Sequence, residues 1–172
     1  MHTAAINWVE KAKDQYPDSF KGKLVLEVGS RYINGTVRIL FEGCDYLGID
    51  LSPGPCVDKV RHVADWNPHT QNLFDTVISC EALEHDKRWR ESLCAMYDLL
   101  LPGGLIILTA GGTGRPEHGT ARTSPSDSPA TTDYYGNITE AMFWSVFNPS
   151  FFVNTYEIED KDGDFRFIGR KA

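Results

Sequence analysis

Three acidic residues follow stretches of sequence that are typical of β-strands. Glu27 lies near the end of LVLEVG, Asp50 ends YLGID, and Asp65 comes after a weaker strand-like stretch. Asp50 follows Glu27 at about the spacing, roughly 20 residues, at which an acid binds ribose hydroxyl groups in nucleotide-binding α/β folds. Asp65 is followed by Trp66, and these two side chains could meet the amino group and the face of an adenine. Each acid alone could be a capping residue, but three in series favour a nucleoside-containing ligand.

A loop with two glycines follows the first of these strands. In LVLEVGSRYING, Gly29 comes directly after the strand and Gly35 follows Asn34. A junction of strand, loop and helix at the carboxyl end of a central strand presents backbone N–H groups to a ligand. A short polar asparagine beside a glycine suits a tight turn of this kind. A turn that only connects strand to helix is the alternative, and the acids that follow favour the ligand site.

The stretch from 110 to 137 holds a second group of side chains that could do chemistry. It is rich in Gly, Ser, Thr and Pro and long for a loop inside a compact domain, which indicates a functional or disordered segment. We interpret it as a substrate-side loop with four candidates to bind the substrate, Arg115, Glu117, Tyr134 and Tyr135. His118 is the candidate general base, because imidazole accepts protons near neutral pH. His85, in EALEH, is the competing candidate, and a solvated surface loop is the alternative for the whole stretch.

Helices and strands alternate along the chain and can position these residues. Apolar periodicity, capping residues and Gly or Pro breaks predict helices over residues 3–16, 36–41, 89–101 and 139–147, and strands over 23–29, 46–51, 57–63, 74–80, 105–109, 151–158 and 165–169. The short connections between the strands favour a parallel sheet with right-handed crossovers. The last two strands flank a charged turn and are predicted to form a hairpin.

Length and charge limit the possible functions. A chain of 172 residues that is 41% hydrophobic can bury a sheet between two helical layers, so we expect residues 1–172 to form one domain with a lead-in helix in residues 1–20. The net charge of −7 provides no general basic surface for phosphate backbones, so a nucleic-acid partner is not expected. The oligomeric state stays open.

The cysteines and the apolar stretches of the sequence indicate a compartment. Cys44, Cys56, Cys80 and Cys94 are far apart and have no metal-ligand spacing with the histidines, so we expect reduced thiols and no metal site. The N-terminus lacks the apolar run of a signal peptide, and no apolar stretch approaches membrane-spanning length. We therefore expect a cytoplasmic protein without membrane contact.

Five motifs follow one another in the order seen in one enzyme family. LVLEVGS with NGTVR, YLGID, the Asp-Trp pair, FDTVISCEALEH and LLPGGLIIL together resemble the class I S-adenosylmethionine-dependent methyltransferases, and the match is similar to the methyltransferase type 11 group over about residues 23–110. The resemblance implies a three-layer, Rossmann-like α/β sandwich. Its mostly parallel seven-stranded sheet would have an antiparallel last strand.

The resemblance implies roles in binding S-adenosylmethionine for several residues. Glu27, Gly29 and Gly35 would shape the methionine end, Asp50 would hold the ribose, Asp65 and Trp66 the adenine, and Cys80 and Glu81 would lie beneath the sulfonium; Ser30, Asn34 and Leu51 are further candidates for cofactor contacts. His85 resembles a residue that often lines the cofactor pocket of the family. The loop departs from the family's commoner pattern, E-x-G-x-G-x-G, because Arg31 stands at the position of the middle glycine.

The implied reaction is in-line transfer of a methyl group from the sulfonium to a nucleophilic atom of an acceptor. The acidic charge and the single polar loop favour a small hydroxylated or amino metabolite, such as a sugar or a natural-product intermediate. A dehydrogenase would need G-x-G-x-x-G and a second substrate domain, which the sequence lacks. A nucleic-acid methyltransferase would carry a motif such as N-P-P-Y where this chain has Ser79-Cys80-Glu81-Ala82. An accessory domain without catalysis and a macromolecular acceptor stay open as alternatives.

Overall fold

The computed structural model describes residues 2–67, 69, 71–153 and 155–172 of the chain. Its helices and strands, in chain order, are α1 (Thr3–Gln15), β1 (Leu24–Val28), β2 (Asp45–Asp50), β3 (Lys59–Val60), β4 (Phe74–Cys80), α2 (Trp89–Leu99), β5 (Leu100–Gly111), α3 (Glu140–Trp144), β6 (Glu157–Lys161) and β7 (Asp164–Arg170). Short 3-10 helices lie between them: η1 (Pro17–Phe20), η2 (Arg38–Leu40), η3 (Val63–Asp65), η4 (Leu83–His85), η5 (Pro125–Asp127) and η6 (Pro149–Phe151).

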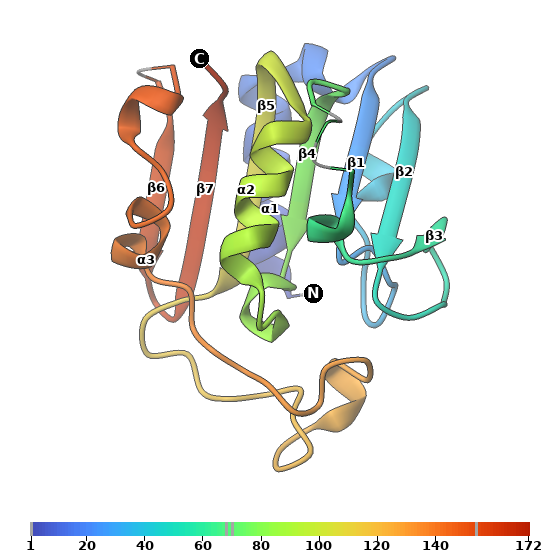
Figure 1. Cartoon of the computed structure of the whole chain (residues 1–172), viewed down its shortest axis with the longest axis vertical. Helices are drawn as coiled ribbons and strands as arrows, with labels where there is room; N and C mark the ends of the chain where they lie inside the picture. Colours follow the sequence, from blue (N-terminus) through green and yellow to red (C-terminus); the bar gives the residue numbers. More distant parts are fainter. Residues whose placement is uncertain (1, 68, 70, 154) are drawn as a thin grey trace.

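In the part of the chain that the structure describes, seven strands form one sheet in the order β3-β2-β1-β4-β5-β7-β6. β1 pairs in parallel with β2 and β4, and β5 pairs in parallel with β4. β7 is antiparallel to both β5 and β6. Figure 1 shows α1 on one side of the sheet and α2 and α3 on the other. The expected three-layer α/β sandwich, with a mostly parallel sheet and an antiparallel last strand, is confirmed.

Alternating strand residues fill two cores, one on each face of the sheet. Val25 packs on one face with Trp8 of α1, while its neighbour Leu26 packs on the other face with Leu93 of α2 and Phe143 of α3. This alternation follows from the period of two along a strand. Because β1 and β4 are buried on both faces, apolar residues dominate both strands, and most of their polar side chains are buried as well. The packed sheet fixes the residues at its carboxyl edge.

Residues 36–41 do not form the predicted helix. The structure has only η2 there, and the chain reaches β2 without an α-helix. The side chain of Thr36 accepts a hydrogen bond from the backbone N–H of Arg38 at 3.1 Å, which competes with helical hydrogen bonding. Gly43, at a φ of +60°, then turns the chain toward β2. The connection is therefore too short and too strongly turned for a helix.

The remaining elements agree with the predictions in type but differ at their ends. β6, Glu157–Lys161, overlaps the predicted strand 151–158 only in its first two residues and includes residues that were expected in the turn. The third strand covers only Lys59–Val60, so it stops well before the predicted end. β5 begins at Leu100 and includes the stretch 102–104 that was expected to separate it from the preceding helix. α3 begins after Thr139, whose side chain caps the helix as predicted, but it ends at Trp144. Tertiary pairing rather than local pattern sets these boundaries.

The loop between β5 and α3 extends beyond the carboxyl ends of β1, β2 and β4 (Figure 1). Within its described residues, η5 is the only regular element. The C-terminal end of the loop is anchored, because the backbone N–H of Gly136 donates to the carbonyl of Glu84 and that of Ile138 donates to Gly111, both at 2.8 Å. The loop therefore covers the edge of the sheet where the predicted ligand residues lie.

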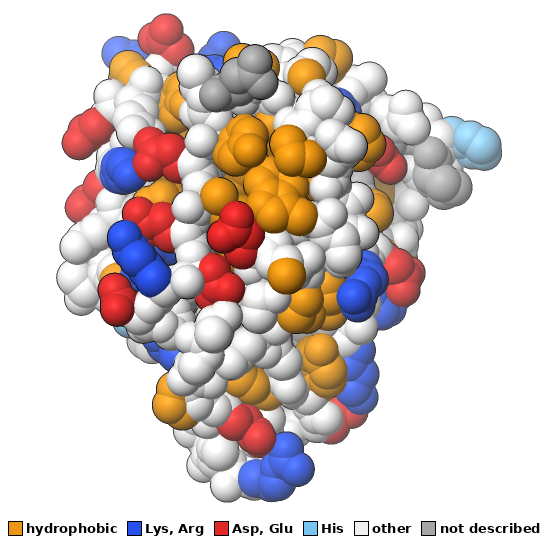
Figure 2. Space-filling view, turned by 90° about the vertical axis from the view of Figure 1, so that its left-hand side faces the viewer, with side chains coloured by type: hydrophobic (Ala, Val, Ile, Leu, Met, Phe, Trp, Pro, Cys, Tyr) orange, Lys and Arg blue, Asp and Glu red, His pale blue; other side chains and the backbone are white. Residues whose placement is uncertain are grey.

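The edge of the molecule at β6 carries a mixed surface. Figure 2 views this side and shows hydrophobic side chains gathered in its upper part, with acidic and basic side chains interspersed beside them. Phe151 and Val153, which precede β6, are 43% and 42% exposed. The residues described on this face form no continuous basic area, in keeping with the net charge of −7. Among the described helices, none has the length and apolar character needed to cross a membrane.

Candidate active site

A cavity of about 500 Å³ lies at the carboxyl ends of β1, β2 and β4, beneath the loop that follows β5. In a doubly wound sheet, ligands bind where the strand order reverses, and here β1 and β4 are the neighbours at that point. The predicted site residues that line the cavity are Glu27, Gly29, Ser30, Asn34, Gly35, Asp50, Leu51, Cys80, Glu81, His85, Arg115, Glu117 and His118. The fold thus brings together most of the residues that the sequence singled out.

The end of β1 forms the floor of the cavity. Glu27 is 2% exposed, and burial raises its pKa to about 7. Its Oε2 atom is buried and has no hydrogen-bond partner among the described residues. Gly29 has a φ of +80°, and its N–H and that of Ser30 both donate to the carbonyl of Ile49, at 2.9 and 3.0 Å. The buried carboxyl group therefore stands beside a loop that is tied to β2.

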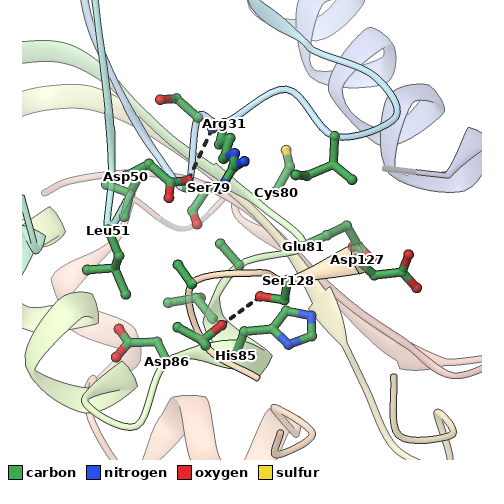
Figure 3. Close-up of a pocket in the computed structure, with 18 of the residues that line it drawn as sticks. Arg31, Asp50, Leu51, Ser79, Cys80, Glu81, His85, Asp86, Asp127 and Ser128 are labelled. Carbon is green, nitrogen blue, oxygen red and sulfur yellow. Dashed lines mark hydrogen bonds between the residues drawn. The ribbon is translucent and has the colours of Figure 1, made fainter. Parts of the chain in front are cut away.

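The end of β2 is joined to the same loop through Asp50. One oxygen of its carboxylate accepts a hydrogen bond from the backbone N–H of Arg31 at 3.1 Å, and the other accepts from the backbone N–H of Ser52 at 3.2 Å. The guanidinium of Arg31 donates to the hydroxyl of Ser52 at 2.7 Å, and Figure 3 shows Arg31 and Asp50 side by side at the cavity wall. Leu51 adds an apolar side chain that is 42% exposed. This wall offers acceptors for hydroxyl groups next to an apolar surface.

The end of β4 supplies another wall of the cavity. Burial raises the pKa of the Cys80 thiol, which stays protonated and apolar in character. Glu81 has a φ of +55°, a backbone conformation that residues other than glycine rarely adopt and that often marks functional sites. Its carboxylate pairs with Nε2 of His2 at 3.0 Å and lies 4.0 Å from the Arg115 guanidinium. Arg115 is itself tied to Asp164 at 2.7 Å.

Two histidines and a tyrosine meet at the loop end of the cavity. The rings of His85 and His118 lie 5.0 Å apart, and the Tyr135 ring lies 5.5 Å and 4.8 Å from them. Burial lowers the pKa of His85 to about 4, so its imidazole is neutral at pH 7. The carboxylate of Glu117 accepts from the Arg122 guanidinium at 3.0 Å, and no hydrogen bond joins it to either histidine in the described part of the chain. The ring of His118 therefore packs against the rings of His85 and Tyr135.

Four predicted site residues lie outside the cavity wall: Asp65, Trp66, Tyr134 and Tyr135. The Asp65 carboxylate accepts from Arg88 at 2.7 Å and is 59% exposed. The Trp66 ring packs edge-on against Phe74 at 5.9 Å and under the Arg61 guanidinium at 4.2 Å. Residues 61–63 line the cavity instead. The Asp-Trp pair therefore lies outside the described cavity wall, because β3 ends at Val60, five residues before Asp65, and the role of the pair at the adenine stays a prediction.

Sequence reasoning missed some of the residues in the wall. His62 lines the cavity, and its Nε2 lies 3.1 Å from the carboxylate of Asp86, which also lines it. The position of Asp86 directly after His85 was the available signal. His2 reaches the cavity from the start of the chain, far in sequence from its partner Glu81, and no local pattern points to it.

Residues 26–108 match the sequence model of a family described as methyltransferase domain. The match begins in β1 and ends in β5, so it spans the strands that carry the cavity. This segment is a methyltransferase domain. The match agrees with the resemblance to class I S-adenosylmethionine-dependent methyltransferases that the sequence motifs indicate, and the methyl acceptor stays a prediction.

Solved methyltransferases share the fold of this domain. The 1,6-didemethyltoxoflavin-N1-methyltransferase of Burkholderia thailandensis, with bound 1,6-didemethyltoxoflavin and S-adenosylhomocysteine, is 16% identical at a TM-score of 0.66, over 98% of this chain and 79% of that chain. The DhpI–SAH complex is 16% identical at 0.63, over 99% and 85%. A chain of the complex between the Haloferax volcanii Trm112 methyltransferase activator and a methyltransferase is 15% identical at 0.58, over 99% of both chains. No curated protein matches the sequence.

Proposed function

We propose that residues 1–172 act as a single domain that transfers the methyl group of S-adenosylmethionine to a small hydroxylated or amino metabolite. One observation carries this proposal: a single cavity joins Glu27 and Asp50, at the strand ends, to His85 and His118, at the loop end. The first pair suits a charged nucleoside-containing cofactor, and the second suits an acceptor that carries a hydroxyl or amino group. Both ligands then lie in one space, as methyl transfer requires.

The residues at the strand ends fit S-adenosylmethionine. The buried Oε2 of Glu27, which has no partner among the described residues, is a suitable acceptor for an ammonium group of the methionine part. The Asp50 carboxylate keeps free lone pairs for ribose hydroxyl groups beside its two backbone hydrogen bonds. Leu51 offers its exposed apolar surface to the adenine. When bound, the cofactor supplies an electrophilic methyl group whose leaving group is a neutral thioether.

The size and cover of the cavity favour a small acceptor. A volume of about 500 Å³ lies within the range of small-molecule sites, and the cofactor must share it. Residues 116–118 and 127–131 of the loop lie over the acceptor end, which leaves a macromolecule little access. The similar Burkholderia thailandensis enzyme is a methyltransferase that was crystallised with 1,6-didemethyltoxoflavin, a small molecule. The net charge of −7 points the same way.

We assign the general base to His118, with His85 as the competing candidate. His85 is 7% exposed, whereas His118 is half-buried at the cavity surface and can reach an acceptor. Tyr135 packs against both rings and would hold them in place, and Arg115 would carry a positive charge to the same region. Loss of a general base lowers turnover by about 10²–10⁴-fold. His118→Gln should therefore lose turnover in this range while its affinity for S-adenosylhomocysteine is retained.

The experiment that tests the proposal uses S-adenosylmethionine with a radioactive methyl group. The protein is incubated with fractionated cell extract, and the products are separated by size. We expect the label in the small-molecule fraction and its loss with Asp50→Ala. A macromolecular acceptor is the second candidate, because one similar structure is a complex with the Trm112 methyltransferase activator. Label in protein or RNA would favour that candidate, and no label despite cofactor binding would favour an accessory domain.

A further inference from the structure

A compact group of metal-ligating side chains borders the loop end of the cavity. Glu84, His85 and His118 each offer a ligand atom, and these atoms all lie within 4.8 Å of one another. Glu84 and His85 come from η4, and His118 comes from the loop after β5. Segments far apart in the sequence therefore converge on one point.

Two polar atoms of this group are buried and have no hydrogen-bond partner among the described residues. Glu84 is 0% exposed; its Oε1 accepts from the backbone N–H of Gly111 at 3.0 Å, while Oε2 has no partner. Nδ1 of His85 is buried and also has no partner. A buried polar atom without a partner costs about 1–3 kcal/mol, so such atoms are rare in folded proteins. A cation bound by Glu84 and His85 would give such buried atoms a partner.

We propose that Glu84, His85 and His118 bind a divalent first-row transition metal ion. Two imidazoles and one carboxylate form a ligand set that leaves coordination positions open for water or a substrate. Imidazole ligands favour Zn²⁺, Fe²⁺ or Co²⁺ over Mg²⁺ and Ca²⁺, which prefer oxygen ligands. His85 and His118 both line the cavity, so an ion that they bind would be accessible from it.

The surroundings hold the ligands in place. Nδ1 of His118 lies 3.2 Å from the carbonyl of Pro116, so a proton on Nδ1 leaves the lone pair of Nε2 for an ion. Gly119, at a φ of +70°, packs so closely on His85 that a Cβ would lie 2.6 Å from the ring. The Tyr135 ring contacts both imidazoles. Such supporting contacts are typical of metal sites, where they fix the orientation of the ligating rings.

A second group of acidic and histidine side chains differs from this one, because arginine side chains already pair with its carboxylates. His2, Glu81 and Asp164 also converge, but the Asp164 carboxylate already pairs with Arg115 at 2.7 Å and with Arg166. Positive charges of the protein itself satisfy that group. The group of Glu84, His85 and His118 has no arginine or lysine ion pair within the part of the chain that the structure describes.

An ion at this point would act on the acceptor, a role that rests on the proposed methyl transfer, whereas the binding of the ion does not. A hydroxyl group bound to the ion gives up its proton to water more readily. Its oxygen then forms the bond to the methyl carbon while the carbon–sulfur bond breaks, and the electron pair of that bond passes to sulfur. With the ion bound, His118 is a ligand, and the ion replaces it in activating the acceptor.

The test measures metal binding directly. Protein freed of metal with a chelator is titrated with Zn²⁺ by calorimetry and with Co²⁺ by visible absorption. We expect one ion per chain, with affinity lowered by more than about 100-fold in His85→Ala, His118→Ala and Glu84→Gln, because even supporting residues cost about 10–100-fold. Glu84→Gln keeps an oxygen for the N–H of Gly111 and therefore preserves the fold.

Two variants serve as controls. His69→Ala removes an exposed histidine, and His2→Ala removes the histidine of the second group; both should keep the wild-type affinity for Zn²⁺. No ion bound, unchanged affinity in His85→Ala and His118→Ala, or loss of affinity in His2→Ala would each overturn the proposal. Affinity for S-adenosylhomocysteine is measured in the same variants without metal. Failure of cofactor binding would therefore be seen separately from failure of metal binding.

Discussion

Gly29 lies so close to Ala82 that a Cβ on Gly29 would stand 2.3 Å from the Cβ of Ala82. The contact joins the loop after β1 to the residue that follows Glu81 at the end of β4. Gly29 also has a φ of +80°. Backbone conformation and space both require glycine here, at the floor of the proposed cofactor site.

Replacing Gly29 by alanine should therefore cost more stability than the φ angle alone explains. Gly43→Ala is the matched control, because Gly43 has a φ of +60° but nothing lies within 4 Å of the position that a Cβ would take there. We expect Gly43→Ala to cost about 1–2 kcal/mol. Gly29→Ala should cost a further 1–3 kcal/mol, roughly, from overpacking, and should weaken S-adenosylhomocysteine binding. Urea unfolding measures the loss of stability in both variants; equal losses would contradict the close contact.

Asp50→Ala should weaken binding of S-adenosylmethionine and S-adenosylhomocysteine. The change removes the proposed ribose acceptor and the two backbone hydrogen bonds that hold Arg31 and Ser52. A loss of about 1–3 kcal/mol corresponds to a roughly 5- to 150-fold weaker affinity by calorimetry. Asp45→Ala, an exposed acid at the start of the same strand, is the control and should bind normally. An unchanged affinity in Asp50→Ala would make this acid purely structural.

Leu51→Ala and Asp65→Ala distinguish two possible adenine sites. Leu51 lines the cavity of the structure, whereas Asp65 is the adenine contact expected from the sequence. Leu51 exposes an apolar side chain at the cavity wall, so its truncation should weaken cofactor binding by roughly 10-fold, at about 0.8 kcal/mol per buried CH₂. Asp65 pairs with Arg88 outside the wall, and Asp65→Ala should change the affinity by less than about 2-fold. A larger loss of cofactor affinity in Asp65→Ala than in Leu51→Ala would instead support the predicted contact of Asp65 with the adenine.

The strands and the acids at their ends could be predicted because their signals are local. LVLEV and FDTVISC are rich in aliphatic and β-branched residues over a length that suits a buried strand, and Glu27 and Asp50 lie at or near the ends of such strands. The end of β3 could not be predicted, because only its pairing with β2 at Ile49 and Asp50 defines it. For that reason the sequence did not show that Asp65 lies outside the cavity wall.

Contacts between distant segments were also beyond the sequence. His2 pairs with Glu81, and Tyr135 packs on His118, and neither contact leaves a periodic or spaced pattern. The helix predicted over 36–41 failed because a hydrogen bond to the side chain of Thr36 and the turn at Gly43 outweigh a weak helical pattern. The apolar pattern defines the sheet, whereas the walls of the cavity depend on how the loops close over it.

Glu27 should make stability depend on pH in a defined window. Burial raises its pKa from the ordinary 4.5 to about 7, so the folded state holds a proton that the unfolded state has released. This contribution is fully present below pH 4.5 and is lost as the pH rises to about 7, at roughly 3 kcal/mol for the whole shift. In Glu27→Gln this fall should be absent from urea unfolding curves. Glu10→Gln, on the exposed side of α1, should behave as the wild type; a fall that persists in Glu27→Gln would assign it to another group.

The loop of residues 110–137 should act as a substrate lid, and hydrogen exchange can test this. Its inner part relies mainly on local hydrogen bonds, such as Asp127 to Ser124 and Thr131 to Ser128, whereas Gly136 and Ile138 are tied to η4 and β5. Amides in its inner part should therefore exchange rapidly in the free protein, and the two anchored amides slowly. Residues 127–131 line the cavity, so S-adenosylhomocysteine should slow their exchange, and an acceptor should slow it further. The amides of β7, which lies outside the cavity, serve as the reference and should not respond. High protection that no ligand changes would show a fixed wall in place of a lid.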